Sequence, residues 1–166
     1  MTEIECWGGA ECTINRVGDV YHEQLFRTGH GARLEDLEHL AALGLRRVRF
    51  PVLWEQHWRG GAEYDFSWAD VRLRRLRELG LDPIIGLVHH GSGPKHTHLL
   101  CDQFGPGLAH FAETVARRYP WVKYYTPVNE PLTTARFSAL YGHWYPHARE
   151  ASCVRCSTKR LLRRLV

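Results

Sequence analysis

The feature that most restricts the fold of this chain is a recurring junction between an amphipathic segment and a short apolar run. In each copy a turn ends the amphipathic segment and a pattern typical of a buried strand follows at once. The second junction lies 36 residues after the first, and a third follows about 40 residues later. The junctions are Gly44-Leu45 before residues 46–50, Gly80-Leu81 before residues 82–89, and Tyr119-Pro120 before residues 121–128. This period indicates a repeated βα unit.

The amphipathic segments place their apolar residues on one face at three- and four-residue spacing, as helices that cover a sheet do. Those residues are Leu34, Leu37, Leu40 and Ala41; Trp68, Val71, Leu76 and Leu79; and Leu108, Phe111, Ala112, Val115 and Tyr119. The expected strands, residues 6–10, 46–50, 83–89 and 122–128, are mostly apolar, so they should pair in parallel with both faces covered. Right-handed crossovers would place their carboxyl ends on one rim. We predict an α/β fold of the (β/α)8 TIM-barrel type, of which residues 1–150 supply about four βα units.

Composition restricts the partners and the compartment. The formal net charge of +4 comes from residues 151–166, which carry five basic side chains and no acid, so residues 1–150 are slightly acidic and we expect no nucleic-acid partner. The start of the chain lacks a basic segment, and no run approaches the roughly 20 apolar residues that span a bilayer. We therefore expect a soluble, cytoplasmic chain without a membrane partner.

Five cysteines are an odd number, which favours free thiols over a disulfide framework. Cys153 and Cys156 form a single C-x-x-C pair without two further ligands at similar spacing, so we expect no metal and no other cofactor.

Asn129 and Glu130 stand where the last apolar run stops. Pro131 cannot donate a ladder hydrogen bond and restricts its predecessor to extended geometry, so the strand should end with Glu130 at its mouth. Cleavage of a glycosidic bond uses a carboxylic acid beside the leaving oxygen and a donor to the sugar 2-hydroxyl. The pair therefore predicts acid catalysis on a sugar, with Glu130 as the acid and Asn129 as the donor.

Ordered motifs around this pair extend the interpretation from residue 6 to about residue 147. They are Trp7-Gly8-Gly9-Ala10, Arg49-Phe50-Pro51-Val52-Leu53-Trp54, Tyr64-Asp65-Phe66, the run from Pro83 to His90, the run from Val122 to Pro131, and Leu140-Tyr141-Gly142-His143-Trp144-Tyr145-Pro146. With these motifs in this order, the chain resembles glycoside hydrolase family 1, the β-glucosidase family, whose members are (β/α)8 barrels that hydrolyse glycosides with retention.

The resemblance implies a role for five residues. Glu130 would be the general acid and base, and Asn129 would hold the 2-hydroxyl of the sugar being cleaved. His89 would contact a neighbouring hydroxyl, Arg49 would lie beside the nucleophile carboxylate, and Asn15 would bind the outer hydroxyls. The implied partner is a carbohydrate.

The tryptophans suggest further contacts. Trp54 and Trp144 lie past strand ends, where the apolar face of a sugar could dock, so we add them to the predicted substrate-binding residues. We expect Trp7 and Trp121 to fill the core instead.

The chain also departs from the family pattern, which marks it as a divergent member. Asn15 replaces a glutamine, Pro51 replaces a serine, and His90-Gly91 replaces a Trp-Asp pair. The family nucleophile, a glutamate after the seventh strand, would lie beyond residue 166. Glu11 and Glu55 are the other acids near the rim, and neither occupies that position. We therefore expect no turnover by this chain.

The family pattern ends at residue 150, and residues 151–166 are basic and match no motif. We interpret this tail as the product of a truncated or frameshifted reading frame, and the alternative is a short natural tail. The unpaired outer strands should then promote self-association through the open barrel edges.

Two other interpretations fit parts of the pattern. One is a non-catalytic carbohydrate-binding or interaction module, possibly the upstream part of a sugar-nucleotide reductase fusion. The other is a metal-dependent hydrolase, because His89, His90, His96 and His98 cluster after the third strand. These four share a single loop region without carboxylate partners at ligand spacing, which favours the glycosidase interpretation.

Overall fold

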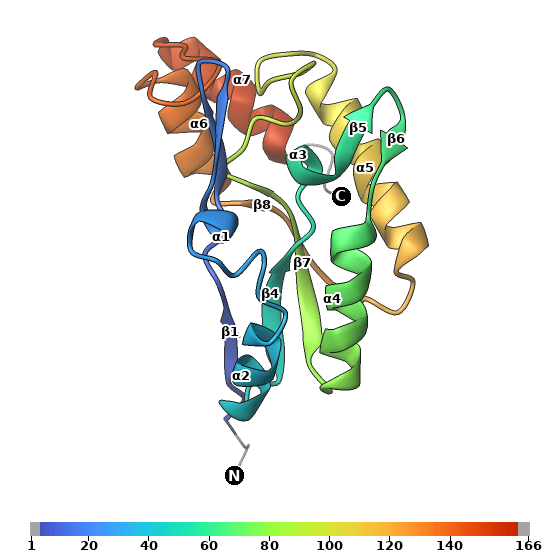
Figure 1. Cartoon of the computed structure of the whole chain (residues 1–166). Helices are drawn as coiled ribbons and strands as arrows, with labels where there is room; N and C mark the ends of the chain where they lie inside the picture. Colours follow the sequence, from blue (N-terminus) through green and yellow to red (C-terminus); the bar gives the residue numbers. More distant parts are fainter. Residues whose placement is uncertain (1–3, 163–166) are drawn as a thin grey trace.

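The computed structural model, which describes residues 4–162, contains a four-stranded parallel sheet flanked by helices (Figure 1). The strands, in their order across the sheet, are β1 (Trp7–Gly9), β4 (Arg47–Pro51), β7 (Asp82–His89) and β8 (Tyr124–Asn129). Chain order and spatial order agree, as consecutive βα units require. The predicted parallel sheet and the partial (β/α)8 architecture are therefore confirmed.

Helices α2 (Asp36–Ala42), α4 (Ser67–Glu78) and α5 (Phe104–Arg118) lie against the sheet and coincide with the predicted amphipathic segments. Alternate strand residues point to opposite faces, so half of each strand enters the layer beneath the helices. The side chains that meet there include Val48, Phe50, Leu73, Leu76, Ile85, Leu87, Phe111 and Val115. Burying each large apolar side chain stabilises the fold by roughly 1.5–3 kcal/mol.

The opposite face of the sheet carries Trp7, Arg47 and Arg49. Trp7 is 57% exposed, so the prediction that it fills the core is wrong. It is the first residue of an outermost strand, and its ring packs on the guanidinium of Arg47 at 4.9 Å. Trp121 packs against the core as expected.

Several short elements were not predicted. They are β2 (Ile14–Val17), β3 (Val20–Glu23), α1 (Gln24–Arg27), α3 (Trp54–His57), β5 (Trp58–Gly60) and β6 (Glu63–Tyr64). β2 and β3 form an antiparallel hairpin whose turn begins at Gly18, with φ of +58°, a left-handed conformation that glycine adopts without strain. In Figure 1 this hairpin rises from the end of β1 toward the helices at the chain's C-terminal side.

Two helices follow β8, namely α6 (Pro131–Ala139) and α7 (Ala151–Leu162), and they pack against each other. The predicted tail therefore begins as a helix, in which Ser157 is buried and Val154 contacts the core. Residues 163–166, with two of the basic side chains, lie outside the described residues, as do residues 1–3.

All five cysteines are free. Within residues 4–162 there is no helix with the length and apolar character needed to cross a bilayer.

Candidate functional site

The ends of β7 and β8 bring together the residues on which the site depends. His89 and Asn129 are partners in the parallel register and close their strands side by side. The residue after each strand has a left-handed backbone, with φ of +61° at His90 and +41° at Glu130. Such conformations are uncommon outside glycine and often occur at functional positions. Pro131 then starts α6, so the prediction that the strand ends with Glu130 at its mouth is confirmed. The expectation that Pro131 holds Glu130 in extended geometry is wrong, because the backbone of Glu130 is left-handed.

The Asn129 side chain contacts three other side chains at this rim. Arg49 Nη2 donates to Asn129 Oδ1 at 2.6 Å, which fixes the orientation of the amide. The amide nitrogen then lies 3.0 Å from Nε2 of His89 and 3.1 Å from Nε2 of His90. An imidazole whose proton is on Nδ1 can accept the amide N–H at Nε2. His90 Nδ1 lies 3.1 Å from Thr134 Oγ1, which can accept that proton's hydrogen bond.

His89 has two further neighbours in the loop after β1. Its Nδ1 lies 3.1 Å from Cys12 Sγ, and its Nε2 lies 3.0 Å from Glu11 Oε1. Burial, reinforced by the charge of Glu11, raises the pKa of Cys12 to about 12, so Cys12 remains a thiol and is not an activated nucleophile.

The two imidazoles at the rim are neutral at physiological pH. Burial lowers the pKa of His89 to about 4, and it also lowers the pKa of His90. The Glu130 carboxylate is 61% exposed and lies 3.9 Å from His90 Nε2. The predicted acid therefore stands at the solvent side of a rigid amide and imidazole network.

Trp144 and Asn15 adjoin this network. The Trp144 ring lies 5.2 Å from the His90 ring and 4.7 Å from the Phe137 ring, measured between centroids. Asn15, on β2, lines an open depression together with Trp144. The structure thus gathers Arg49, His89, Asn129 and Glu130 in one network and puts the other two at its side.

Trp54 is buried in the core and does not lie at the rim. It is 1% exposed and packs against Phe104 and Phe111 at ring distances of 5.7 and 6.3 Å, so the prediction that it forms a sugar subsite is wrong. The chain enters α3 directly after β4, and this turn directs the indole into the layer beneath α5. Its ring also lies so close to Gly107 that a Cβ there would be 2.6 Å from it.

Glu55 is a functional candidate whose environment the sequence did not indicate. Glu55 Oε1 accepts the Gly93 N–H at 2.7 Å, while Oε2 is buried with no hydrogen-bond partner. The residue as a whole is partly exposed, but its carboxyl group is enclosed, and burial raises its pKa to about 7. A Cβ at position 91 would lie 2.0 Å from Oε1, so the glycine there is the signal that could have indicated this contact.

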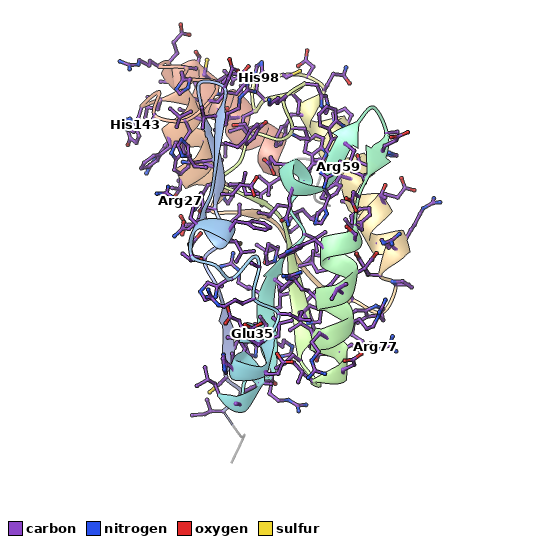
Figure 2. All side chains as sticks on the ribbon, in the orientation of Figure 1. Arg27, Glu35, Arg59, Arg77, His98 and His143 are labelled. Atoms are coloured by element: carbon purple, nitrogen blue, oxygen red, sulfur yellow. The ribbon has the colours of Figure 1, made fainter. Side chains whose placement is uncertain are left out.

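Of the four histidines of the metal-hydrolase interpretation, His89 and His90 both contact the Asn129 amide, whereas His96 and His98 have other partners. The His96 ring packs on Trp58 at 4.6 Å, and the His98 ring contacts Tyr145 at 5.6 Å. Figure 2 places His98 and His143 in different parts of the upper end of the molecule. Across residues 4–162, no group of three histidine, cysteine or acidic side chains is arranged to hold a metal ion.

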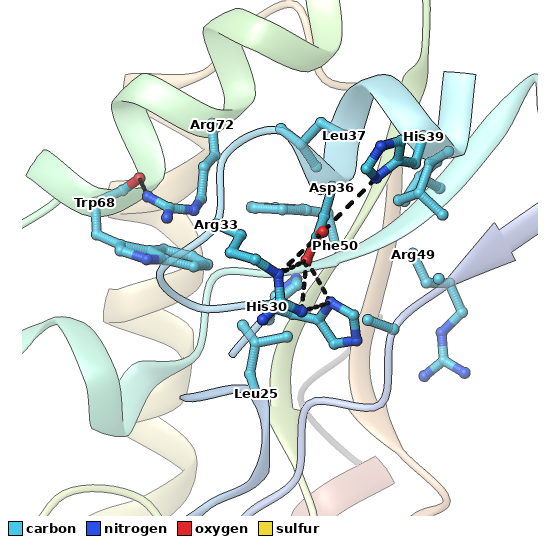
Figure 3. Close-up of a pocket in the computed structure, with 15 residues that line it drawn as sticks. Leu25, His30, Arg33, Asp36, Leu37, His39, Arg49, Phe50, Trp68 and Arg72 are labelled. Carbon is cyan, nitrogen blue, oxygen red and sulfur yellow. Dashed lines mark hydrogen bonds and ion pairs between the residues drawn. The ribbon is translucent and has the colours of Figure 1, made fainter. Parts of the chain in front are cut away.

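A mostly apolar cavity of ≈ 320 Å³ lies beneath α2. At its mouth Asp36 accepts from Arg33 at 3.2 Å and contacts His30 at 2.6 Å, and Figure 3 shows these side chains turned toward one another. In the same view the Arg49 side chain points away from the cluster. We interpret the cluster as an ionic tie between α2 and the preceding loop.

Comparisons with known proteins give likenesses in sequence and in fold. No protein-family model matches the chain. It is 28% identical over 132 residues to beta-glucosidase 4 of Oryza sativa subsp. japonica, a match that covers 74% of this chain and 27% of the rice protein. The rice match therefore spans about a quarter of that protein.

Solved structures of low sequence identity share the fold. A beta-glucosidase from Exiguobacterium marinum gives a TM-score of 0.72 at 20% identity, covering 80% of this chain and 32% of that one. The family 1 beta-glucosidase from Thermotoga maritima gives 0.69 at 21% identity, covering 81% and 32%. The chain thus spans about a third of the length of these enzymes. The fold and the sequence likeness together confirm the resemblance to glycoside hydrolase family 1, and the fold of the chain is a partial (β/α)8 barrel similar to that of the family 1 β-glycosidases.

Proposed function

We propose that this chain carries the sugar-binding, acid-bearing part of a family 1-type glycosidase site. The observation that supports this most is the Asn129 amide, oriented by Arg49 and shared between two neutral imidazoles, directly before Glu130. An amide held in this way is preorganised, and a ligand hydroxyl would replace one of the two imidazoles as the acceptor of its N–H.

In this proposal each residue has a distinct task. Glu130 protonates the leaving oxygen of an O-glycosidic bond, and Asn129 binds the 2-hydroxyl of the sugar. His89 contacts the neighbouring hydroxyl. Trp144 offers an apolar face for the ring, and Asn15 binds hydroxyls at the far side of the depression that it shares with Trp144.

Hydrolysis with retention needs a second carboxylate about 5–5.5 Å from the acid. The two other acids near the rim are engaged elsewhere, since Glu11 is held by Thr13 and Glu55 by the Gly93 amide. We therefore propose that the chain by itself binds sugars with negligible turnover, and that catalysis requires a carboxylate from further βα units.

Binding of a glycosidase inhibitor tests the site. The Thermotoga maritima beta-glucosidase has been solved in complex with glucoimidazole, which makes this compound a suitable probe. We expect glucoimidazole to bind the wild-type chain, and Asn129→Ala to weaken binding by about 10- to 100-fold, the size expected for losing one or two strong hydrogen bonds. Isothermal titration calorimetry measures both affinities.

Gln103→Ala provides a matched control, because it also removes an amide, at an exposed position at the start of α5. Its affinity should equal that of the wild type. Equal affinities for Asn129→Ala and the wild type would contradict the assignment.

We further propose that the chain self-associates through its outermost strands. In the described sheet β1 and β8 each have one strand neighbour, and the large side chains Trp7 and Tyr124 on them are exposed. Size-exclusion chromatography at micromolar concentration should give a species larger than one chain, and a sharp monomer peak would contradict this prediction.

A further inference from the structure

The depression that Asn15 shares with Trp144 covers one face of the β2–β3 hairpin and has a volume of ≈ 810 Å³. Asn15 and His22 are opposite one another in the hairpin register, so their side chains lie on the same face. Ile14 and Glu23 are the next opposite pair, and they share the other face, where Ile14 is buried. The floor of the depression is therefore the outer face of the hairpin, and the Trp144 ring lies beside it.

Arg27, in α1 directly after the hairpin, gives this depression a positive charge. It lines the depression, is exposed, and has no ion-pair partner within residues 4–162. No aspartate or glutamate is among the described residues that line the depression, since Glu11 and Glu23 line other cavities. The amides of Asn15 and Gln24 add hydrogen-bond donors. This combination favours an anionic ligand over a neutral one.

Trp144 connects the depression to the proposed sugar site. Its ring lies 5.2 Å from the His90 ring and also lines the depression. In Figure 2 Arg27 and His143, the residue before Trp144, lie along the same side of the molecule. An indole offers an apolar face on which a sugar ring packs. A sugar packed on Trp144 would therefore adjoin both the rim at His90 and the depression that Arg27 lines.

A single arginine favours a carboxylate as the anion. A guanidinium can bind either a carboxylate or a phosphate through two parallel hydrogen bonds. A phosphate monoester carries about two negative charges at neutral pH, so one cation leaves part of its charge unbalanced, whereas a carboxylate carries one. On a hexose, the exocyclic carbon can become a carboxylate while the ring hydroxyls and the glycosidic bond remain in place. It is attached to the ring carbon opposite carbon 2, so it points away from a 2-hydroxyl held by Asn129.

We propose, building on the proposed function, that Arg27 determines specificity by pairing with the carboxylate of a hexuronic acid. The site then selects β-glucuronides over β-glucosides.

The test compares two non-hydrolysable ligands, phenyl 1-thio-β-D-glucuronide and phenyl 1-thio-β-D-glucoside, by calorimetry at about pH 7, where the carboxylate is ionised. We expect the wild-type chain to bind the glucuronide about tenfold more tightly, the effect of one charge-assisted contact. Arg27→Gln should bring the two affinities together. Arg27→Lys should keep part of the preference, because lysine retains the charge without the planar fork. Added salt should reduce the preference of the wild type.

Arg74→Gln is the matched control, because it removes the same charge from an exposed position on α4 outside the depression and should keep the preference. Equal affinity of the wild type for both ligands, or an unchanged preference in Arg27→Gln, would overturn the role of Arg27 while the binding of the glucoside stands. Tighter binding of phenyl 1-thio-β-D-glucoside 6-phosphate than of the glucuronide would also overturn it, because the anion would then be a phosphate. If neither of the first two ligands binds, or Asn129→Ala binds both as well as the wild type does, the proposed function itself fails.

Discussion

Trp54→Ala is expected to lower the free energy of unfolding by about 3–5 kcal/mol, the range for deleting a buried tryptophan. The indole is fully enclosed between the sheet and α5, where it meets Phe104 and Phe111. Removing it leaves a cavity that the rigid surroundings fill only in part. Because a domain of this size is stable by about 5–15 kcal/mol, the loss is a large share of the total. Urea denaturation measures it.

Trp144→Ala is the informative comparison, because Trp144 is only partly buried and lies at the rim beside His90. We expect it to cost much less stability than Trp54→Ala and to weaken sugar binding instead. A small stability loss for Trp54→Ala, together with weaker sugar binding, would show instead that Trp54 belongs to the sugar subsite.

Glu55→Gln is expected to stabilise the protein above pH 7 by roughly 3 kcal/mol, the free-energy equivalent of the shift in its pKa. The pKa of Glu55 rises from 4.5 to about 7 in the folded state because its carboxyl group is buried. The folded state therefore binds more protons than the unfolded state between these values. Stability due to this group is fully present below pH 4.5, falls as the pH rises to about 7, and is constant above.

Two histidines change the free energy of unfolding with pH in the opposite direction. The effect of Glu55 is therefore obtained from the difference between the variant and the wild type. Burial lowers the pKa of both His57 and His89 from 6.5 to about 4, and this makes stability rise between those values. The difference in unfolding free energy between Glu55→Gln and the wild type isolates Glu55. It should grow from near zero at pH 4.5 to its full size at about pH 8.

The exposed Glu35→Gln controls for the change in net charge and should give no comparable difference. A pH-independent difference for Glu55→Gln would show that the carboxyl group is not enclosed in solution. The contact matters for the site because Glu55 holds the Gly93 amide, close after His89 and His90 in the chain.

The sequence was sufficient to predict the parallel sheet and its covering helices, because these elements follow from local periodicity. Apolar runs bounded by turns predicted the parallel strands, and the expected meeting of their carboxyl ends on one rim predicted that His89 lies beside Asn129. Pro131 predicted the end of β8 for a reason confined to its own ring.

The rest depends on contacts between residues far apart in the chain. Whether Trp54 faces solvent or core is decided by the turn into α3, which spans only four residues and has no periodicity to detect. The contact of Glu11 with His89 joins positions 78 residues apart, which no local pattern encodes. Trp7 was expected in the core because tryptophan usually packs there, yet its strand lies at an edge of the sheet.

The most direct test of the site is a titration of the ¹⁵N-labelled chain with glucoimidazole, followed by amide chemical shifts in two-dimensional NMR spectra. If the rim at the ends of β7 and β8 is the sugar site, the largest shifts will occur at His89, His90, Asn129, Glu130 and Trp144, and Asn129→Ala will abolish them. Shifts concentrated in the cavity beneath α2, or no saturable shifts at millimolar ligand, would contradict it.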